Sequence, residues 1–294
     1  MITHNKVQQI VLNIIFVLLC VLAIAPFILL ISSSLTEEAE LMRSGYSFFP
    51  KKFSIYAYEY LFRSSTKIIR GIGISFLVTL IGTVASVCIT LMFAYPLSRK
   101  EMPGRNFFSF FVFFTMLFNG GLVPTYMMYT QIFHIKNTLW ALLLPSLLMS
   151  AFYVIMMRSF FTNSIPDSLI EAARIDGAGE YRILLQVVTP LSKPMIATLA
   201  LMSGLAYWND WTNSLYYITD TKLYSLQAIL NNIINSITFL QSTADSNMAG
   251  AAANMPSVGI RMAIAVVGVF PILCIYPFFQ KYFVKGIVVG GVKG

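Results

Sequence analysis

The chain has 294 residues, of which 57% are hydrophobic and only 11% are charged, and its formal net charge is +8. Average soluble domains carry about 25% charged residues, so this composition argues against a single soluble globule such as a cytosolic enzyme. The positive charges fall between long apolar runs and form no basic stripe with interleaved aromatics, which argues against a nucleic-acid partner. The expected fold class is therefore an all-α membrane protein.

Apolar runs of about 18 residues or more without charges predict membrane-spanning helices. Residues 1–36 contain the first of them, a predicted N-terminal transmembrane helix over Val7–Thr36, and a loop of mixed charge follows at 37–70. Residues 71–294 are expected to form the core of the bundle. The predicted spans of this core, in chain order, are Gly71–Ser98, Asn106–Ile135, Asn137–Met157, Pro194–Asn209 and Met262–Gln280.

Two of these predicted spans have unusual features. Asn119 lies inside the third run, beside Gly120 and Gly121 and before Pro124. This cluster predicts a broken or loosened helix, which membranes tolerate only where the backbone faces protein or water. The fifth run, Pro194–Asn209, is shorter than the about 20 residues of a standard span. We therefore expect Lys193 to snorkel at one end, Asp210 to occupy a protected site at the other end, or both.

The short loops indicate the orientation of the bundle, because cytoplasmic loops carry an excess of Lys and Arg. The loop after the second span holds Arg99, Lys100 and Arg105, and the tail 281–294 holds three lysines. Both termini and the loop 158–193 are therefore expected on the cytoplasmic side. The loops 37–70 and 220–258 are expected on the extracellular side.

The cytoplasmic loop 158–193 contains a predicted surface helix, Pro166–Asp176. Pro166 suits the first turn of a helix, Asp167 suits its positive N-terminal end, and Gly177 is a natural stop. An isolated helix this short is marginal in water, so it needs a surface to dock against. The residues alone leave two alternatives open, namely a socket on another protein and the surface of the bilayer.

The chain offers little for metal or redox chemistry. Cys20, Cys88 and Cys274 each lie inside an apolar run and are expected to behave as small hydrophobic residues, without a disulfide framework. The two histidines are far apart in the sequence and have no metal-ligand spacing to a partner. No metal site is therefore predicted.

Several motifs resemble one transporter family. The stretch Glu171–Ala178 reads EAARIDGA and is followed by Pro190 and Pro194, which resembles the EAA loop of binding-protein-dependent ABC importer permeases. Further segments are similar to the carbohydrate branch of that family, which includes the maltose-type second permease subunit. They are Ala94–Arg99 (AYPLSR), Asn119–Tyr126 (NGGLVPTY), Trp208–Trp211 (WNDW) and the glycine-rich C-terminal stretch from Lys285.

The resemblance implies a type I importer (MetI-like) fold with six transmembrane helices and a cytoplasmic coupling helix, in a bacterial cell membrane. It implies a permease subunit of an ATP-driven oligosaccharide importer that works by alternating access. The implied partners are a homologous second permease, two cytoplasmic ABC ATPase subunits, an extracellular sugar-binding lipoprotein, the oligosaccharide and the membrane lipids.

By the same resemblance, the predicted surface helix is the coupling helix that docks on an ATPase. The chain has no G-x-x-x-x-G-K-[ST] sequence to cradle phosphates. ATP and magnesium are therefore expected on the partner ATPase, with no cofactor on this chain. The expected ATPase-coupling residues are Glu171, Ala172, Ala173, Arg174, Asp176 and Gly177, with Gly177 acting either by contact or by ending the helix.

The candidate substrate-pathway residues are polar or aromatic side chains in or beside the spans. Polar groups within a span are costly and often functional, and sugars are held by amide and carboxylate groups with an aromatic face under the ring. The candidates are Asn119, Tyr153, Trp208, Asn209, Asp210 and Trp211. An aromatic belt at the membrane interface is the alternative explanation for the tryptophans.

Two other classes of protein fit the sequence less well. A membrane enzyme would be expected to show His-Glu-x-x-His, Gly-x-Ser-x-Gly or paired carboxylates within the membrane, and these patterns are absent from the sequence. An ion-coupled secondary transporter would be expected to show internal repeats and ionisable residues at the middle of the membrane. The predicted spans contain almost no ionisable residues, and no repeat is evident. The sequence therefore predicts a transport subunit and not an enzyme.

Overall fold

A computed structural model describes residues 6–63, 65–243 and 258–290. These residues form helices and one isolated β-bridge between Thr36 and Phe53, and they contain no strand. The predicted all-α class is confirmed. The chain divides into two compact units, of which unit 1 contains 1–68 and 230–271, and unit 2 contains 69–229 and 272–294.

Unit 1 begins with α1, Lys6–Ser34, whose described side chains are almost all apolar and exposed up to its last turn. A helix that is apolar on every side suits lipid. The polar end of α1 is tied to the following loop, because Ser34 Oγ and the Tyr58 hydroxyl are hydrogen-bonded at 2.8 Å. That loop carries α2, Glu38–Ser44, and α3, Tyr56–Phe62.

Several of the described helices are candidates for membrane spans. Three helices are long and apolar enough to cross a membrane, at Gln8–Ser34, Thr66–Ser98 and Val258–Phe278. Two bent helix pairs also qualify when each pair is taken as one span, which gives up to five among the described residues. The second and sixth spans belong to helices longer than predicted, α4 (Ser65–Ser98) and α16 (Val258–Gly290). The predicted C-terminal tail is therefore helical through Gly290, and residues 291–294 lie outside the described residues.

The third predicted span is broken, as its Asn-Gly-Gly cluster indicated. α5, Arg105–Leu117, ends before the cluster, and α6, Leu122–Met127, continues into the π-helical turn η1, Met128–Ile132, at an angle of 111° to α5. Gly121 has φ +89°, and its N–H donates a 2.9 Å hydrogen bond to Asn119 Oδ1. The bend therefore needs a glycine at this position.

The fourth predicted span, Asn137–Met157, is wrong in its start and its continuity. The run contains only the short α7, Trp140–Leu143, before α8 begins at Ala151 and continues to Ser164. Asn137 and Ser146 both have positive φ, a backbone conformation that a right-handed helix does not contain. An apolar run without charges is thus divided by turns.

The rest of unit 2 alternates short helices with one span. α12, Lys193–Asn209, matches the predicted fifth span and is bent by 84° from the helical segment before it. The remaining elements are α9 (Asp167–Ile175), α10 (Glu180–Ile183), η2 (Leu184–Val188), α11 (Thr189–Leu191), α13 (Thr212–Tyr217), η3 (Thr221–Leu223) and α14 (Leu226–Thr243), which continues into unit 1.

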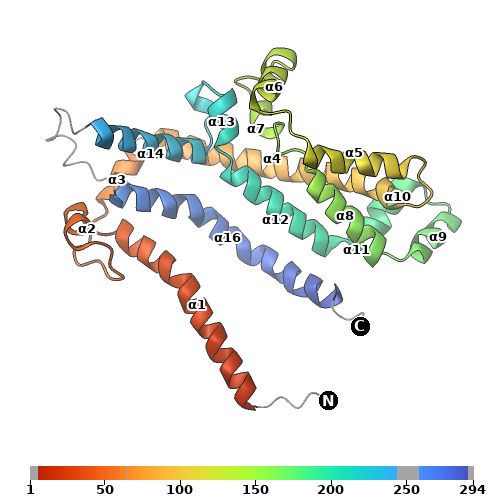
Figure 1. The fold of residues 1–294 in the computed structure, drawn as a ribbon, viewed down its shortest axis with the longest axis horizontal. Helices are drawn as coiled ribbons and strands as arrows, with labels where there is room; N and C mark the ends of the chain where they lie inside the picture. The colour runs from red at the N-terminus through yellow and green to blue at the C-terminus, as the bar shows by residue number, and fades with distance from the viewer. Residues whose placement is uncertain (1–5, 64, 244–257, 291–294) are drawn as a thin grey trace. The chain divides into compact units, whose positions relative to one another are not determined.

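Two apolar clusters hold unit 2 together. One joins the C-terminal half of α4 to α5, α8, α9, α10 and α12, and its centre includes the fully buried Met157 and Phe161. The other joins the N-terminal half of α4 to α7, α12 and α13 around Tyr207 and Tyr217. In Figure 1, α9 and α10 lie at the C-terminal end of α4. Because the first cluster includes residues of both α9 and α4, it holds the predicted surface helix against that end of α4.

Candidate functional site

The predicted surface helix is α9, Asp167–Ile175, which begins and ends within one residue of the prediction. Pro166 occupies the N-cap position with φ −62° and ψ 134°, and Asp167 places a carboxylate in the first turn, where the helix dipole favours negative charge. One side chain anchors the helix, because Ile170 is 2% exposed and belongs to the apolar cluster of α4 and α8.

Gly177 ends α9 through its backbone geometry. It has φ +78°, its N–H donates to Arg174 O at 3.0 Å, and the N–H of Ala178 donates to Ala173 O at 3.0 Å. These two bonds form a Schellman motif, in which the residue with positive φ is usually glycine. Ala173 and Ala178 both pack against the apolar cluster, so the cap holds the end of the helix to the body of the unit.

The outer face of α9 is open. Glu171, Ala172 and Asp176 are exposed, whereas Ala173 and Arg174 are partly buried. Ile175 is 86% exposed, which is unusual for a large aliphatic side chain on a helix outside the predicted spans. The helix thus presents two carboxylates, a small-residue position and the apolar side chain of Ile175, and Leu169 is also 44% exposed.

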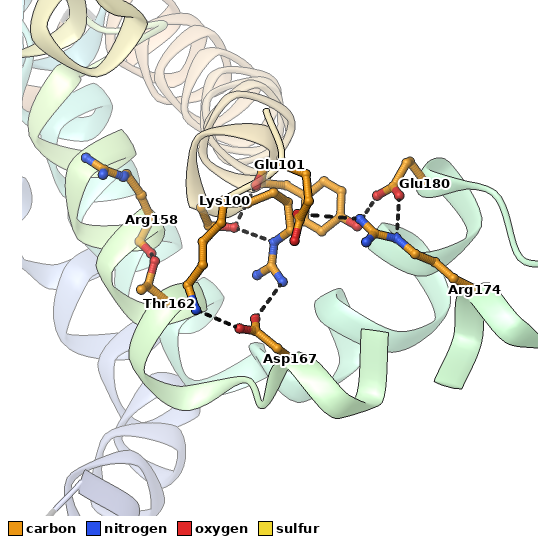
Figure 2. A network of polar contacts seen from close by, with 10 residues as sticks. Lys100, Glu101, Arg158, Thr162, Asp167, Arg174 and Glu180 are labelled. Atoms are coloured by element: carbon orange, nitrogen blue, oxygen red, sulfur yellow. Dashed lines mark hydrogen bonds and ion pairs between the residues drawn. The ribbon is translucent and has the colours of Figure 1, made fainter. Parts of the chain in front are cut away.

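The N-terminal end of α9 is paired with residues that follow α4. The Asp167 carboxylate lies 3.5 Å from Arg99 Nη1 and 3.2 Å from Lys100 Nζ (Figure 2). Arg99 is buried, donates from Nε to Ser98 Oγ at 2.9 Å, and lies over the Tyr95 ring at 5.4 Å from the centroid. Lys100 is largely exposed, and exposed pairs contribute only about 0.2–1 kcal/mol, so the buried Arg99 is the more consequential partner.

The C-terminal end of α9 is paired in a second place. Arg174 Nε donates to Glu180 Oε1 at 2.9 Å, and Arg174 Nη2 lies 3.9 Å from Glu101 Oε2 (Figure 2). The other oxygen of Glu180 accepts a hydrogen bond from the Tyr95 hydroxyl at 2.5 Å. The hydrogen bond to Glu180 raises the pKa of the Arg174 guanidinium above its ordinary value.

A cavity of about 400 Å³ adjoins these contacts. Its lining combines apolar and charged side chains, namely Met92, Tyr95, Pro96, Arg99, Glu101, Met102, Arg174, Glu180, Tyr181 and Leu184. Of the six predicted coupling residues, only Arg174 lines this cavity. Tyr95, Arg99 and Glu180 were not among the coupling residues predicted from the sequence. The available signal was the charge pattern of the run Arg99-Lys100-Glu101. Its two positive charges complement Asp167, and its negative charge complements Arg174.

The candidate substrate residues do not share one environment. Asn119 is exposed in the bend between α5 and α6, and its side-chain oxygen is used by Gly121. Tyr153 is partly buried on α8 and packs against the apolar cluster near α9. Trp208 is 5% exposed on α12 and lines an apolar cavity of about 240 Å³ together with Thr79 and Thr83 of α4.

The residues that follow Trp208 are more open. Asn209 is exposed and Trp211 is 39% exposed. The carboxylate of Asp210 accepts hydrogen bonds from Thr212 N, Thr212 Oγ1 and Asn213 N, which orders the turn between α12 and α13. Burial raises the pKa of Asp210, and the hydrogen bonds from Thr212 and Asn213 oppose that shift.

Metal binding has no support in the described part of the chain, where no group of three or more His, Cys, Asp or Glu side chains is placed to hold an ion. Cys20, Cys88 and Cys274 are free and exposed on apolar helices.

Comparison with known proteins gives consistent matches. Residues 74–289 match the family model described as the inner membrane component of binding-protein-dependent transport systems. The chain is 38% identical to protein LplC of Bacillus subtilis (strain 168), covering 93% of this chain and 90% of LplC. It is also 38% identical to the polygalacturonan/rhamnogalacturonan transport system permease protein YtcP of the same organism, covering 95% of this chain and 94% of YtcP.

A solved structure shares the fold. The crystal structure of a bacterial ABC transporter involved in the import of the acidic polysaccharide alginate contains a chain that matches with a TM-score of 0.77 and 28% identity. The match covers 96% of this chain and 98% of that chain.

Proposed function

We propose that this chain, which belongs to the family of inner membrane components of binding-protein-dependent transport systems, forms half of the translocation pathway of an ATP-driven oligosaccharide importer. As a member of that family it is a multi-pass membrane transport subunit and not an enzyme. The family implies a partner permease, an ATPase and a substrate-binding protein. In the proposed complex there are two copies of the ATPase, and they bind all of the ATP and magnesium.

The presentation of α9 is the observation that carries the proposal. Ile170 and the Schellman motif fix the helix to the unit, while Glu171, Ala172, Ile175 and Asp176 remain exposed on the other side. The outer face of this fixed helix carries an exposed apolar side chain and carboxylates. Such a face suits docking on a protein better than lying on a bilayer, because an anionic lipid surface favours Lys and Arg. We propose that each of the six predicted coupling residues either contacts the ATPase or sets the shape of the surface that does.

The contacts among loops support the proposed topology. Residues of the two loops expected in the cytoplasm meet, as in the pair Arg99 and Asp167. Asn137, at the start of the fourth predicted span, meets the start of the loop expected outside, because Asn137 Oδ1 accepts hydrogen bonds from Thr219 N at 2.6 Å and Asp220 N at 3.1 Å. This grouping is consistent with both termini in the cytoplasm of a bacterial cell.

The substrate class follows from the relatives. YtcP is described as a permease for polygalacturonan/rhamnogalacturonan, and the matching crystal structure comes from an importer of alginate. An oligosaccharide is therefore the proposed substrate of this chain. Asn119, Asn209, Asp210 and Trp211 are the best-placed candidates for its pathway, whereas Tyr153 and Trp208 are more enclosed and would contact it only after helices separate.

Transport assays with the complete complex test this function. The chain, its partner permease, the ATPase and the binding protein are reconstituted in liposomes, and uptake of labelled oligosaccharides released from plant or algal polysaccharides is followed. Uptake is expected with ATP and is expected to be lost when the nucleotide-binding lysine of the ATPase is replaced by alanine. Uptake that persists with the inactive ATPase, or that follows an ion gradient, would instead favour the secondary transporter.

A further inference from the structure

We propose that Glu180 is a positioning residue that fastens α9 to the C-terminal end of α4, so that α4 receives the displacement of α9. This inference rests on the proposed function, because it assumes that an ATPase moves α9. It adds a specific route into the membrane, from Arg174 through Glu180 and Tyr95 to the helix Ser65–Ser98.

Glu180 joins three elements through its two carboxylate oxygens. Oε1 accepts from Arg174 Nε on α9 at 2.9 Å, and Oε2 accepts from the Tyr95 hydroxyl on α4 at 2.5 Å, while Glu180 itself begins α10. Hydrogen bonds to an ionised carboxylate are stronger than neutral ones. A single carboxylate thus links the last turn of α9 with the last turns of α4.

The α4 side of this link is rigid. Tyr95 is 5% exposed, and its ring meets Phe161 of α8 edge to face with centroids 6.4 Å apart. The Leu97 carbonyl near the end of α4 accepts from Arg158 Nε of α8 at 3.0 Å. The hydroxyl that Glu180 holds therefore cannot move without the end of α4.

The residues after α4 reinforce the same attachment. Arg99 and Lys100 face Asp167 at the start of α9, and Glu101 faces Arg174 near its end. The residues 99–101, which directly follow α4, therefore place complementary charges against both ends of α9.

The test uses the reconstituted complete complex with Tyr95→Phe and Glu180→Gln. Tyr95→Phe removes only the hydroxyl and keeps the ring on Phe161. Glu180→Gln keeps the size of the side chain and removes its charge. Tyr56→Phe and Glu59→Gln, on exposed positions of α3, are the matched controls. ATPase retained on purification, ATP hydrolysis, melting temperature and oligosaccharide taken up per ATP are measured for each variant.

Both test variants are expected to retain the ATPase and to hydrolyse ATP, but to take up at least about threefold less oligosaccharide per ATP, because the lost hydrogen bond is one to a charged group. The double variant is expected to be no worse than Glu180→Gln, since both changes remove one shared contact. The controls are expected to match the unsubstituted complex.

A second measurement follows the motion itself. Spin labels at the exposed positions Phe93 of α4 and Ser168 of α9 are expected to keep one separation with and without ATP in the parent complex, and to show a changed separation in Glu180→Gln. Unchanged uptake per ATP in both variants, loss of the ATPase on purification, or a separation in the parent complex that changes with ATP would each overturn the proposal. Failure of ATP-dependent uptake in the parent complex would instead refute the function on which it rests.

Discussion

Gly82 of α4 lies directly against the ring of Tyr207 of α12. A methyl group added at Gly82 would be 2.4 Å from Cζ of that ring. The ring has little room to move, because Tyr207 is 3% exposed and its hydroxyl donates a 2.9 Å hydrogen bond to Leu143 O. The approach of the two spans therefore depends on the absence of a side chain at Gly82.

Gly82→Ala is expected to destabilise the permease by about 1–3 kcal/mol, the usual cost of overpacking. The measurement is the melting temperature of the purified complex. Gly73→Ala is the matched control on the same helix, since nothing lies within 4 Å of a methyl group there, and alanine favours a helix interior over glycine by about 0.5–1 kcal/mol. Equal melting temperatures for the two variants would contradict this account of the interface.

Gly177→Ala is expected to weaken the end of α9. Nothing lies within 4 Å of a methyl group at this position, so the cost comes from φ +78° alone, at about 1–2 kcal/mol for an L-residue. Amide hydrogen exchange at positions 177 and 178 is expected to accelerate correspondingly. Gly179→Ala, at φ −72°, is expected to leave exchange nearly unchanged, and an equal effect at both glycines would contradict the cap assignment.

Ile175→Glu is expected to release the ATPase without unfolding the permease. The side chain is 86% exposed, so the variant keeps its melting temperature. Burying an isoleucine in an interface contributes about 1.5–3 kcal/mol, so affinity is expected to fall about tenfold or more. Binding of the purified ATPase to the permease measures the effect. Ile55→Glu, on the exposed loop before α3, is the control, and undiminished ATPase binding by Ile175→Glu would place the docking surface elsewhere.

The position of α9 was predictable because its signals are local. Pro166, Asp167 and Gly177 mark its start and end within a few residues of the helix. The structure places Asp167 and Gly177 as the sequence indicated, and it places Pro166 at the N-cap, just before the first turn. The Asn119–Gly121 break was predictable for the same reason, because it follows from the conformational preference of glycine beside a short polar side chain.

The start of the fourth span depends on distant contacts and could not be predicted in this way. Asn137 has φ +58°, its N–H donates to Tyr217 O, and its side chain holds Thr219 and Asp220. The apolar run that follows gives no sign of these partners. The link between Tyr95 and Glu180 was missed for the same physical reason, since hydrogen bonds between residues far apart in the sequence leave no periodic pattern.

Glu38→Ala is expected to loosen the first turn of α16. The carboxylate of Glu38 accepts hydrogen bonds from Val258 N at 2.9 Å and Gly259 N at 2.8 Å, which satisfies two of the N–H groups that a helix N-terminus leaves without intrahelical partners. Loss of a capping carboxylate costs about 1–2 kcal/mol, so exchange of these two amides is expected to accelerate about fivefold to thirtyfold. Glu59→Ala on α3 serves as the control. If exchange at Val258 and Gly259 is the same in both variants, Glu38 does not hold the start of the last span.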